Sequence, residues 1–519
     1  MRLSNPWAAC AIVFIASFCT LVIELIAGRI MAPYIGVSLY TWTSIIGVVL
    51  AGISLGNYVG GRIADRAASP FTLGVLFLLS GLASLAILLT TYWVMSANLA
   101  QGLGLVARIV LYTTVIFFAP AFLMGTISPV VIKLSLDDLN RTGNIVGRIY
   151  AVSTAGSIVG TFATGFYLIE ALGTRSIVWL VGLVLIMLGL AIGGFGRPPL
   201  RAATVAMIAV VLAVPATLYY YTVVAPGTRE QFAAPCVHES SYYCIRISSA
   251  TLDGVPVRSL VLDHLVHSYV ALDNPTFIGY GYERVYNEVT EWHLQEKKQF
   301  SSLFIGGGGY TFPKYLSVVY PQSDIHVLEI DPAVTAAAHE YLQLPSDTPV
   351  KTHNQDARLW YIENQPVGRF DLVYGDAFND LSVPYHLTTL EFDRMVRRSM
   401  KDDGILLTNI IDNYHTGEFL RAYLRTLTES FEHVYLFGLG KAWEGRGPST
   451  YIAVASPSRL NLDNFRQFVG PTTKREKVTG IMDDEMLREY LASGRRIVLT
   501  DDYAPVDNLV ARLFVERGF

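Results

Sequence analysis

The stretch LFIGGGGYTF at 303–312, followed by HVLEIDP at 326–332, decides the fold of the C-terminal half of the chain. A short apolar run, a glycine turn, an amphipathic segment and a second apolar run ending in an acid are typical of a βαβ unit. Glycines at the carboxyl end of a strand let the backbone approach a ligand where side chains would collide. Glu329 ends the second strand, where a carboxylate accepts hydrogen bonds from ribose hydroxyls. The pattern predicts a nucleoside-binding α/β domain.

Acids also follow the next two strands of this half. Asp356 comes after a third strand, and Asp376 ends FDLVYGD at 370–376. The carboxyl ends of parallel strands meet at one edge of a sheet, so we expect both acids in one cleft, with Asp356 accepting an adenine amino hydrogen. GILLTNII at 404–411 supplies another strand. Two final strands are expected at 433–440 and 449–456. Because no long crossover helix lies between them, we expect them to form an antiparallel edge.

A small β-subdomain is expected before the α/β domain. YCIRISSA at 243–250 and VRSLVLDHLVHSYV at 257–270 show partial alternation around a turn at Asp253 and Gly254. The sequence thus predicts three domains, a helical membrane domain, a small β-subdomain and a Rossmann-like domain, at 1–225, 236–280 and 281–519.

The N-terminal half is too apolar for a soluble domain. The chain has 519 residues, of which 52% are hydrophobic and 16% charged, and long uncharged runs alternate with short Arg-bearing loops before residue 225. Membrane helices of roughly 20 residues give this pattern. The sequence predicts an α-helical bundle of about seven spans, at 7–32, 40–61, 71–94, 104–132, 150–172, 176–195 and 203–224.

Two features inside the expected spans suggest alternatives to simple anchoring. SLGNYVGGRIADR at 54–66 resembles the loop after the second helix of major-facilitator transporters, although small residues there also fit close helix packing. Glu24 is an acid inside a span, where either a structural pairing with Arg29 or a proton or substrate site would explain it.

Charge and cysteine usage limit the partners. A net charge of −4 and the absence of a Lys/Arg-rich tract argue against nucleic acid. The four cysteines show no metal-ligand spacing, so no metal site is expected. Cys236 and Cys244 either form a small disulfide in an oxidising compartment or remain free thiols.

From about 242 to 456 the chain resembles the spermidine synthase (polyamine aminopropyltransferase) family. The motifs occur in the family's order, and the tail LTDDYAPVDNL at 499–509 with the membrane bundle resembles multi-pass proteins that carry such a domain. An NAD-type GxGxxG turn is excluded because Tyr310 and Thr311 follow Gly309. The matching motifs are LVLDHLVHS, a Tyr-Glu pair, IGGGG, LEID, QDA and FDLVYGDAFND.

The resemblance implies a methyltransferase/spermidine synthase fold and a role for each matching residue. Asp376 would be the catalytic acid-base, Glu329 would hold the ribose and Asp356 the adenine. His267 stands where the family usually has Gln. The turn residues and the remaining acceptor-side residues implied by the resemblance are Gly306, Gly307, Gly308, Gly309, Tyr282, Glu283, Asp380 and Asp412.

One departure concerns the donor substrate. The family turn carries an Asp that contacts the amine of decarboxylated S-adenosylmethionine, and here that position is Gly309. Losing this acid removes an attraction for a cationic chain and also a repulsion, roughly 4 kcal/mol at about 4 Å, against a carboxylate. Intact S-adenosylmethionine therefore becomes a second candidate donor.

The lead prediction is a membrane-anchored enzyme that cleaves the C–S bond of a sulfonium nucleotide, releases methylthioadenosine and transfers an aminopropyl group to a polyamine. An S-adenosylmethionine lyase that forms homoserine lactone is the alternative, and a nucleoside- or polyamine-gated transporter is a further one. No permanently bound cofactor is expected. The other expected partners are membrane lipid and, as in many aminopropyltransferases, a second copy of the chain.

The expected orientation in the cell (inner) membrane conflicts with this substrate. With seven spans, Lys and Arg gather on the side of the N-terminus, so the positive-inside rule predicts a cytoplasmic N-terminus and a soluble domain on the other side. Cells make S-adenosyl nucleotides in the cytoplasm. The sequence leaves the side of the soluble domain open.

Overall fold

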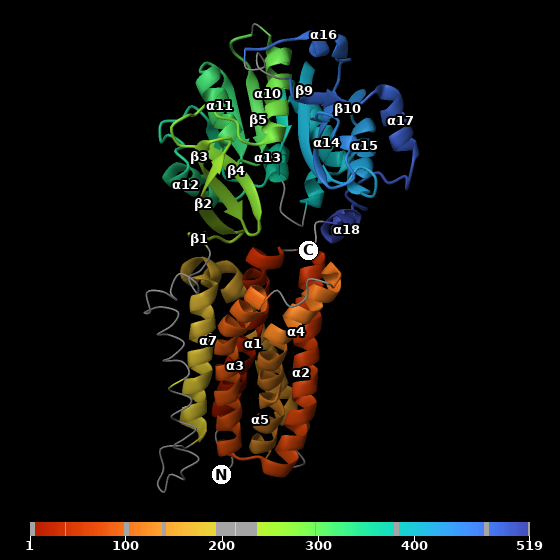
Figure 1. Cartoon of the computed structure of the whole chain (residues 1–519). Helices are drawn as coiled ribbons and strands as arrows, with labels where there is room; N and C mark the ends of the chain where they lie inside the picture. The colour runs from red at the N-terminus through yellow and green to blue at the C-terminus, as the bar shows by residue number, and fades with distance from the viewer. Residues whose placement is uncertain are drawn as a thin grey trace. The chain divides into compact units, whose positions relative to one another are not determined.

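The chain forms two compact units, Met1–Cys244 and Ile245–Phe519, in a computed structural model (Figure 1). Each unit is described by itself. The structure describes residues 6–36, 38–97, 103–136, 142–193, 213, 236–295, 297–377, 383–471 and 477–516.

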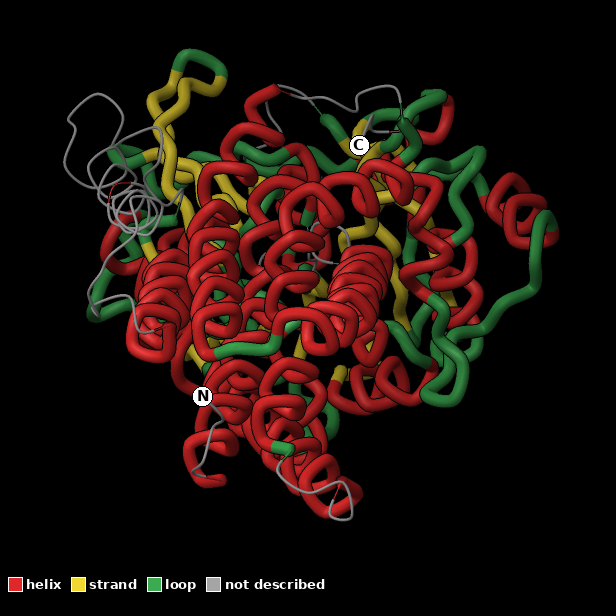
Figure 2. Tube along the Cα trace, turned by 90° about the horizontal axis from the view of Figure 1, so that it is seen from below, coloured by secondary structure: helices red, strands yellow, loops and turns green. Residues whose placement is uncertain are grey.

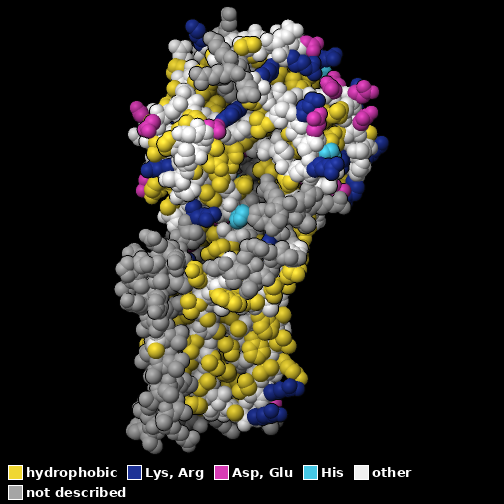
Figure 3. Space-filling view, in the orientation of Figure 1, with side chains coloured by type: hydrophobic (Ala, Val, Ile, Leu, Met, Phe, Trp, Pro, Cys, Tyr) yellow, Lys and Arg dark blue, Asp and Glu magenta, His cyan; other side chains and the backbone are white. Residues whose placement is uncertain are grey.

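The N-terminal unit is a bundle of apolar helices, seen nearly end-on in Figure 2. Among the described residues, five helical segments are long and apolar enough to cross a membrane, which indicates a multi-pass membrane protein. Figure 3 shows that the visible described surface of this unit is mostly hydrophobic, with Lys and Arg at one end. The elements are α1 (Pro6–Ile35), α2 (Leu39–Ala67), α3 (Pro70–Ala97), α4 (Leu105–Gly125), α5 (Ile127–Ser135), α6 (Thr142–Ala163), η2 (Thr164–Leu168) and α7 (Ile169–Gly193).

The expected count of seven spans is confirmed only in part. The first four expected spans coincide with α1, α2, α3 and the α4–α5 pair. The expected spans 150–172 and 176–195 fall in one helical segment of 52 residues, Thr142–Gly193. Gly173 interrupts that segment with a non-helical φ of 73°, which separates α6 from most of α7. The expected span 203–224 lies outside the described residues, apart from residue 213.

Close contacts at glycines hold the bundle together. A Cβ atom on Gly56 of α2 would lie 2.1 Å from the carbonyl oxygen of Phe122 in α4, and one on Gly156 of α6 would lie 2.3 Å from that of Phe14 in α1. Such contacts let helix backbones approach closely, which is how helices associate in a membrane. Packing therefore accounts for Gly56, which lies in the segment that resembles a transporter loop.

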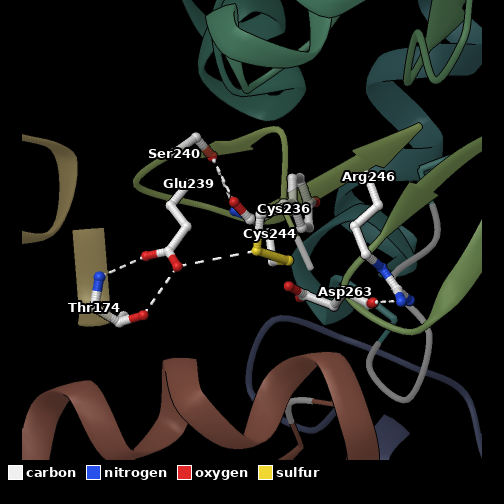
Figure 4. Close-up of a disulfide and its surroundings, with 8 residues drawn as sticks. Thr174, Cys236, Glu239, Ser240, Cys244, Arg246 and Asp263 are labelled. Carbon is white, nitrogen blue, oxygen red and sulfur yellow. Dashed lines mark hydrogen bonds between the residues drawn. A yellow bond between two sulfur atoms is a disulfide. The ribbon is translucent and has the colours of Figure 1, made fainter. Parts of the chain in front are cut away.

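The segment after the bundle is fixed by a disulfide between Cys236 and Cys244, whose Cα atoms lie 5.2 Å apart (Figure 4). This resolves the sequence alternative in favour of a disulfide. Between the two cysteines, the short strand β1 (His238–Glu239) brings Glu239 to α7, where its carboxylate accepts hydrogen bonds from the Thr174 backbone and hydroxyl at 2.7 and 2.9 Å. The guanidinium of Arg29 donates to the Ser241 carbonyl.

The C-terminal unit begins with the expected small antiparallel sheet. Its strands pair in sequence order, and β3 and β4 are joined by a tight turn. The strands are β2 (Cys244–Leu252), β3 (Val255–Leu262) and β4 (Leu265–Ala271).

The larger sheet has eight strands in the order β12-β10-β11-β9-β8-β5-β6-β7. From β9 to β7, neighbouring strands pair parallel, whereas β11 pairs antiparallel with β9 and β10, and β10 pairs antiparallel with β12. The sequence predicted the antiparallel edge for β10 and β11. The strands are β5 (Ser301–Ile305), β6 (Asp324–Leu328), β7 (Lys351–His353), β8 (Phe370–Gly375), β9 (Met400–Asp412), β10 (His433–Leu439), β11 (Ser449–Ser456) and β12 (Thr479–Ile481).

Helices connect these strands, and the α/β order puts the carboxyl ends of β5, β6 and β8 at one edge of the sheet. The helices are α10 (Gly281–Leu294), α11 (Thr311–Val319), α12 (Pro332–Tyr341), α13 (Ala357–Asn364), η4 (Tyr385–Leu387), α14 (Leu390–Ser399), α15 (Phe419–Thr428), η5 (Ala442–Glu444), α16 (Leu462–Gln467), α17 (Asp484–Ala492) and α18 (Val506–Glu516).

Candidate active site

The glycine turn joins β5 to α11 beside the end of β8. Gly306 has φ 98°, and a Cβ atom on it would lie 2.6 Å from the carbonyl oxygen of Asp376. A side chain there would separate the ends of two neighbouring strands, so this position requires glycine. The Asp376 amide donates to the Ile305 carbonyl at 2.9 Å, which ties the acid to the turn.

Glu329 follows β6 and contacts the same turn. Its carboxylate accepts hydrogen bonds from the amides of Gly307 at 2.9 Å and Asp331 at 3.0 Å. Burial raises the pKa of the Glu329 carboxyl to about 7, although these bonds favour the ionised form. The acid expected to hold a ribose therefore lies beside the glycine turn.

Asp376 is held by two side chains from different elements. Tyr282, at the start of α10, donates from its hydroxyl to Oδ2 of Asp376 at 2.8 Å, and Asn409 of β9 donates from Nδ2 to Oδ1 at 2.9 Å. Both carboxylate oxygens thus have a fixed donor. This arrangement positions the acid at the end of β8.

Two acids of the site, Asp376 and Glu283, have pKa values that differ from each other. Burial raises the pKa of the Asp376 carboxyl to about 6, and the hydrogen bonds from Asn409 and Tyr282 limit the rise. Burial and the charge of Asp376 raise the pKa of the Glu283 carboxyl to about 8. At pH 7, Asp376 is mainly ionised and Glu283 mainly protonated. Such separation is typical of sites that transfer protons.

Asp376, Tyr282, Glu283 and the glycine turn line a small, partly open cavity. The small sheet, α10, the glycine turn, α11 and the end of β8 all contribute to it. The lining residues are His267, Ser268, Tyr282, Glu283, Tyr286, Phe304, Gly306, Gly307, Gly308, Gly309, Thr311, Phe312, Pro313 and Asp376. The structure thus brings eight residues expected from the sequence to one cavity: His267, Tyr282, Glu283, Asp376 and the four glycines.

A second cavity, with about 460 Å³ of empty space, lies next to the ends of the same two strands. Ile305 and Ala377 line it, each one residue away from a residue that lines the first cavity. Its other walls are largely apolar and include Val383, Pro384 and Leu387. A flat apolar group fits this environment better than a charged one.

The structure places two other expected acids, Asp356 and Asp412, away from the first cavity. The Asp356 carboxylate caps α13 through the Leu359 amide at 2.9 Å and contacts Nε2 of His386 at 2.9 Å. Asp412 is fully buried, and its two oxygens accept from the amides of Asn413 and Leu420, both at 2.8 Å. Neither is among the residues that line the first cavity. Asp380 lies outside the described residues.

Sequence reasoning missed Asn409 and Ser268. Asn409 is a polar residue inside the apolar run GILLTNII, and β8 pairs with β9 so that Gly375 lies opposite Thr408. The next residues along each strand are Asp376 and Asn409. A buried amide in an apolar strand was therefore the available signal.

Comparisons with known proteins point to one family. The probable polyamine aminopropyl transferase of Bifidobacterium longum is 28% identical over 226 residues, which make up 40% of this chain and 48% of that protein. The polyamine aminopropyltransferase of Vibrio vulnificus is 33% identical over 108 residues, 21% of this chain and 36% of that protein. This chain therefore spans about half or less of the length of these relatives.

A crystal structure of a probable spermidine synthase from Corynebacterium glutamicum is 22% identical, with a TM-score of 0.44, over 52% of this chain and 97% of that chain. No family model matches the chain.

A glycine turn between β5 and α11, with acids after successive parallel strands, is typical of α/β domains that bind nucleosides. More particularly, part of the chain is distantly similar to the spermidine synthase, or polyamine aminopropyltransferase, family, and this part is accompanied by helices able to span a membrane.

Proposed function

We propose that this protein is a membrane-anchored transferase that cleaves the C–S bond of a sulfonium nucleotide and passes the three-carbon chain to an amine. Methylthioadenosine is the second product. Aminopropyl transfer to a polyamine is the leading form of this reaction, because the named relatives are polyamine aminopropyltransferases. We place the protein in the cell membrane.

The reaction needs a nucleophile, a carbon and a leaving sulfur in line. An amine reaches the site as an ammonium ion and passes a proton to the ionised Asp376 carboxylate. The freed lone pair on nitrogen then forms a bond to the carbon next to the sulfonium. The electrons of the broken C–S bond remain on sulfur, which leaves as neutral methylthioadenosine.

The observation that carries this proposal is the setting of Asp376. Its two oxygens accept hydrogen bonds from Tyr282 and Asn409, and its pKa of about 6 keeps it ionised near neutral pH while leaving it basic enough to accept a proton. The carboxylate lines the cavity together with the glycine turn. A proton acceptor therefore lies where we expect the donor chain and the amine to meet.

The neighbouring apolar cavity supports an adenosine ligand. We place the adenine base among Ile305, Ala377 and Leu387, which line this cavity. We place the ribose beside the glycine turn, near Glu329, whose carboxylate accepts a hydrogen bond from the Gly307 amide. The Asp356 side chain is held by α13 and His386. Its expected contact with the adenine amino group would require that pairing to change.

The test is the mass of the products. The purified full chain is incubated with S-adenosylmethionine or its decarboxylated form, each with and without putrescine. We expect methylthioadenosine together with a putrescine adduct, and only when the amine is present. Methylthioadenosine formation that does not depend on any amine would reject the transferase.

The lyase remains a second candidate because of Gly309. The acid that contacts the donor amine in the resembled family is absent at this position, so a donor that retains its carboxylate is not repelled there. In the lyase, that carboxylate would itself attack the carbon and release homoserine lactone with methylthioadenosine.

A further inference from the structure

The space beside Gly309 is filled by a serine from the small sheet. A Cβ atom on Gly309 would lie 1.9 Å from Oγ of Ser268 in β4. The Ser268 hydroxyl therefore occupies the position that a side chain at 309 would need. Ser268 is 2% exposed and lines the first cavity, and among the described residues its hydroxyl has no hydrogen-bond partner.

A second hydroxyl lies at the start of α11. Thr311 is 4% exposed and lines the same cavity, and its Oγ1 has no hydrogen-bond partner within the described part of the chain. Buried hydroxyls without a partner are uncommon in folded proteins and often indicate a missing ligand or water.

The helix itself adds positive potential at this point. α11 has nine residues, and no side chain caps its N-terminus, because the N-cap residue Tyr310 makes no capping bond. Amides at a helix N-terminus favour an anion and disfavour a cation. Together with two hydroxyl donors, they form an environment suited to a carboxylate.

The two acids that line the cavity, Glu283 and Asp376, differ in charge at pH 7 and therefore in how strongly they repel a ligand carboxylate. Glu283 has a pKa of about 8 and is mainly neutral at pH 7. Asp376 is mainly ionised and attracts an ammonium group. A ligand with both an ammonium and a carboxylate therefore finds a complementary group for each, whereas a ligand with only an ammonium leaves both hydroxyls unused.

We propose that Ser268, Thr311 and the N-terminus of α11 bind the carboxylate of an intact S-adenosylmethionine-type nucleotide, so that the donor is not decarboxylated. This inference rests on the C–S cleavage of the proposed function, and it replaces the decarboxylated donor of aminopropyl transfer by the intact one. If an amine is the acceptor, the chain transferred is then a 3-amino-3-carboxypropyl group. The bonds that form and break are those given above.

Calorimetry on the purified full chain tests the inference with ligands that cannot react. S-adenosylhomocysteine carries the carboxylate, its decarboxylated analogue lacks only that group, and methylthioadenosine lacks the whole amino acid chain. We expect S-adenosylhomocysteine to bind about tenfold or more tightly than the decarboxylated analogue. Equal binding, or tighter binding of the analogue, overturns the inference.

Variants test whether Ser268 and Thr311 cause the preference for a ligand that carries the carboxylate. Ser268→Ala and, separately, Thr311→Val should each remove most of the preference for S-adenosylhomocysteine while leaving methylthioadenosine binding unchanged. Ser302→Ala is the matched control, because Ser302 is also fully buried and its hydroxyl also lacks a partner among the described residues, but it does not line the cavity. A preference retained in both variants would refute the assigned roles.

The two proposals fail differently. If methylthioadenosine does not bind, the proposed function and this inference fall together. If methylthioadenosine binds and the carboxylate makes no difference, only the donor assignment is wrong.

Discussion

The N-terminal helices and the C-terminal α/β unit both depend on glycines. The two units differ in which atoms lie next to the glycine Cα atoms. In the bundle, a Cβ on Gly56 or Gly156 would meet the backbone of another helix at 2.1 or 2.3 Å. In the site, a Cβ on Gly308 would have no heavy atom of the described residues within 4 Å. A glycine that is essential for packing is therefore distinguished from one that leaves room for a ligand only by its neighbours.

The same contrast holds for buried polar groups. In the bundle, hydroxyls bond within their own helix, as Ser80 does to the Leu76 carbonyl at 2.8 Å and Thr113 to the Ile109 carbonyl at 2.7 Å. In the site, the hydroxyls of Ser268 and Thr311 have no partner among the described residues. Ser80 and Thr113 thus satisfy their hydroxyls within their own helices, as a membrane favours, whereas the site keeps two donors available.

Asp376→Asn should have the largest effect of the variants considered, because Asp376 in the α/β unit is the expected proton acceptor of the reaction. We expect turnover to fall by about 10²–10⁴-fold, because an amide cannot accept the proton from the amine. Methylthioadenosine release is measured by mass spectrometry, with the exposed-loop variant Asp347→Asn as control. Unchanged turnover would remove the proposed role of Asp376.

Gly56→Ala tests the packing half of the contrast. The added methyl group would collide with the Phe122 carbonyl, so we expect the full chain in detergent to lose about 1–3 kcal/mol of stability. Gly47→Ala, in the same helix but with nothing of the described residues within 4 Å, should be neutral or slightly stabilising. Thermal melting measures both, and equal melting temperatures would contradict the packing role.

Removing the Ser268 side chain and adding an acid at position 309 should change the donor preference from the intact to the decarboxylated nucleotide. Ser268→Gly makes room, and Gly309→Asp then restores the acid of the resembled family. We expect the double variant to bind the decarboxylated analogue about tenfold more tightly than S-adenosylhomocysteine. Gly309→Asp alone should perturb the site, because its Cβ would overlap the Ser268 hydroxyl. A double variant with the wild-type preference would contradict the pairing.

Tyr282→Phe should have the smallest effect, a shift in pH dependence. The Tyr282 hydrogen bond lowers the pKa of Asp376, so its loss raises that pKa above about 6. Activity requires the ionised carboxylate, and it should therefore fall at a higher pH on the acid side than in the wild type. The expected displacement is about one pH unit or less. An acid limb that does not move would separate Tyr282 from the titration of Asp376.

Much of the site could be predicted from the sequence because its residues follow strands at fixed positions. Gly306, Glu329 and Asp376 each come directly after an apolar run, and strand order alone places them at one edge. Asp356 and Asp412 also come at or shortly after the ends of strands, yet their carboxylates bond to backbone amides and, for Asp356, to His386. No pattern in the chain shows whether an acid will cap a helix or face a cavity.

The sequence by itself determined the division into apolar helices and an α/β domain, the succession of strands along the chain and the glycine turn, because hydrophobic periodicity and turn residues act over a few neighbouring positions. Only the tertiary structure decided that Ser268 fills the space beside Gly309, that Asn409 and Tyr282 hold Asp376, and that Cys236 bonds to Cys244. Apart from the nearby cysteine pair, these contacts join segments far apart in the chain. They exist only once the sheet and its helices have packed.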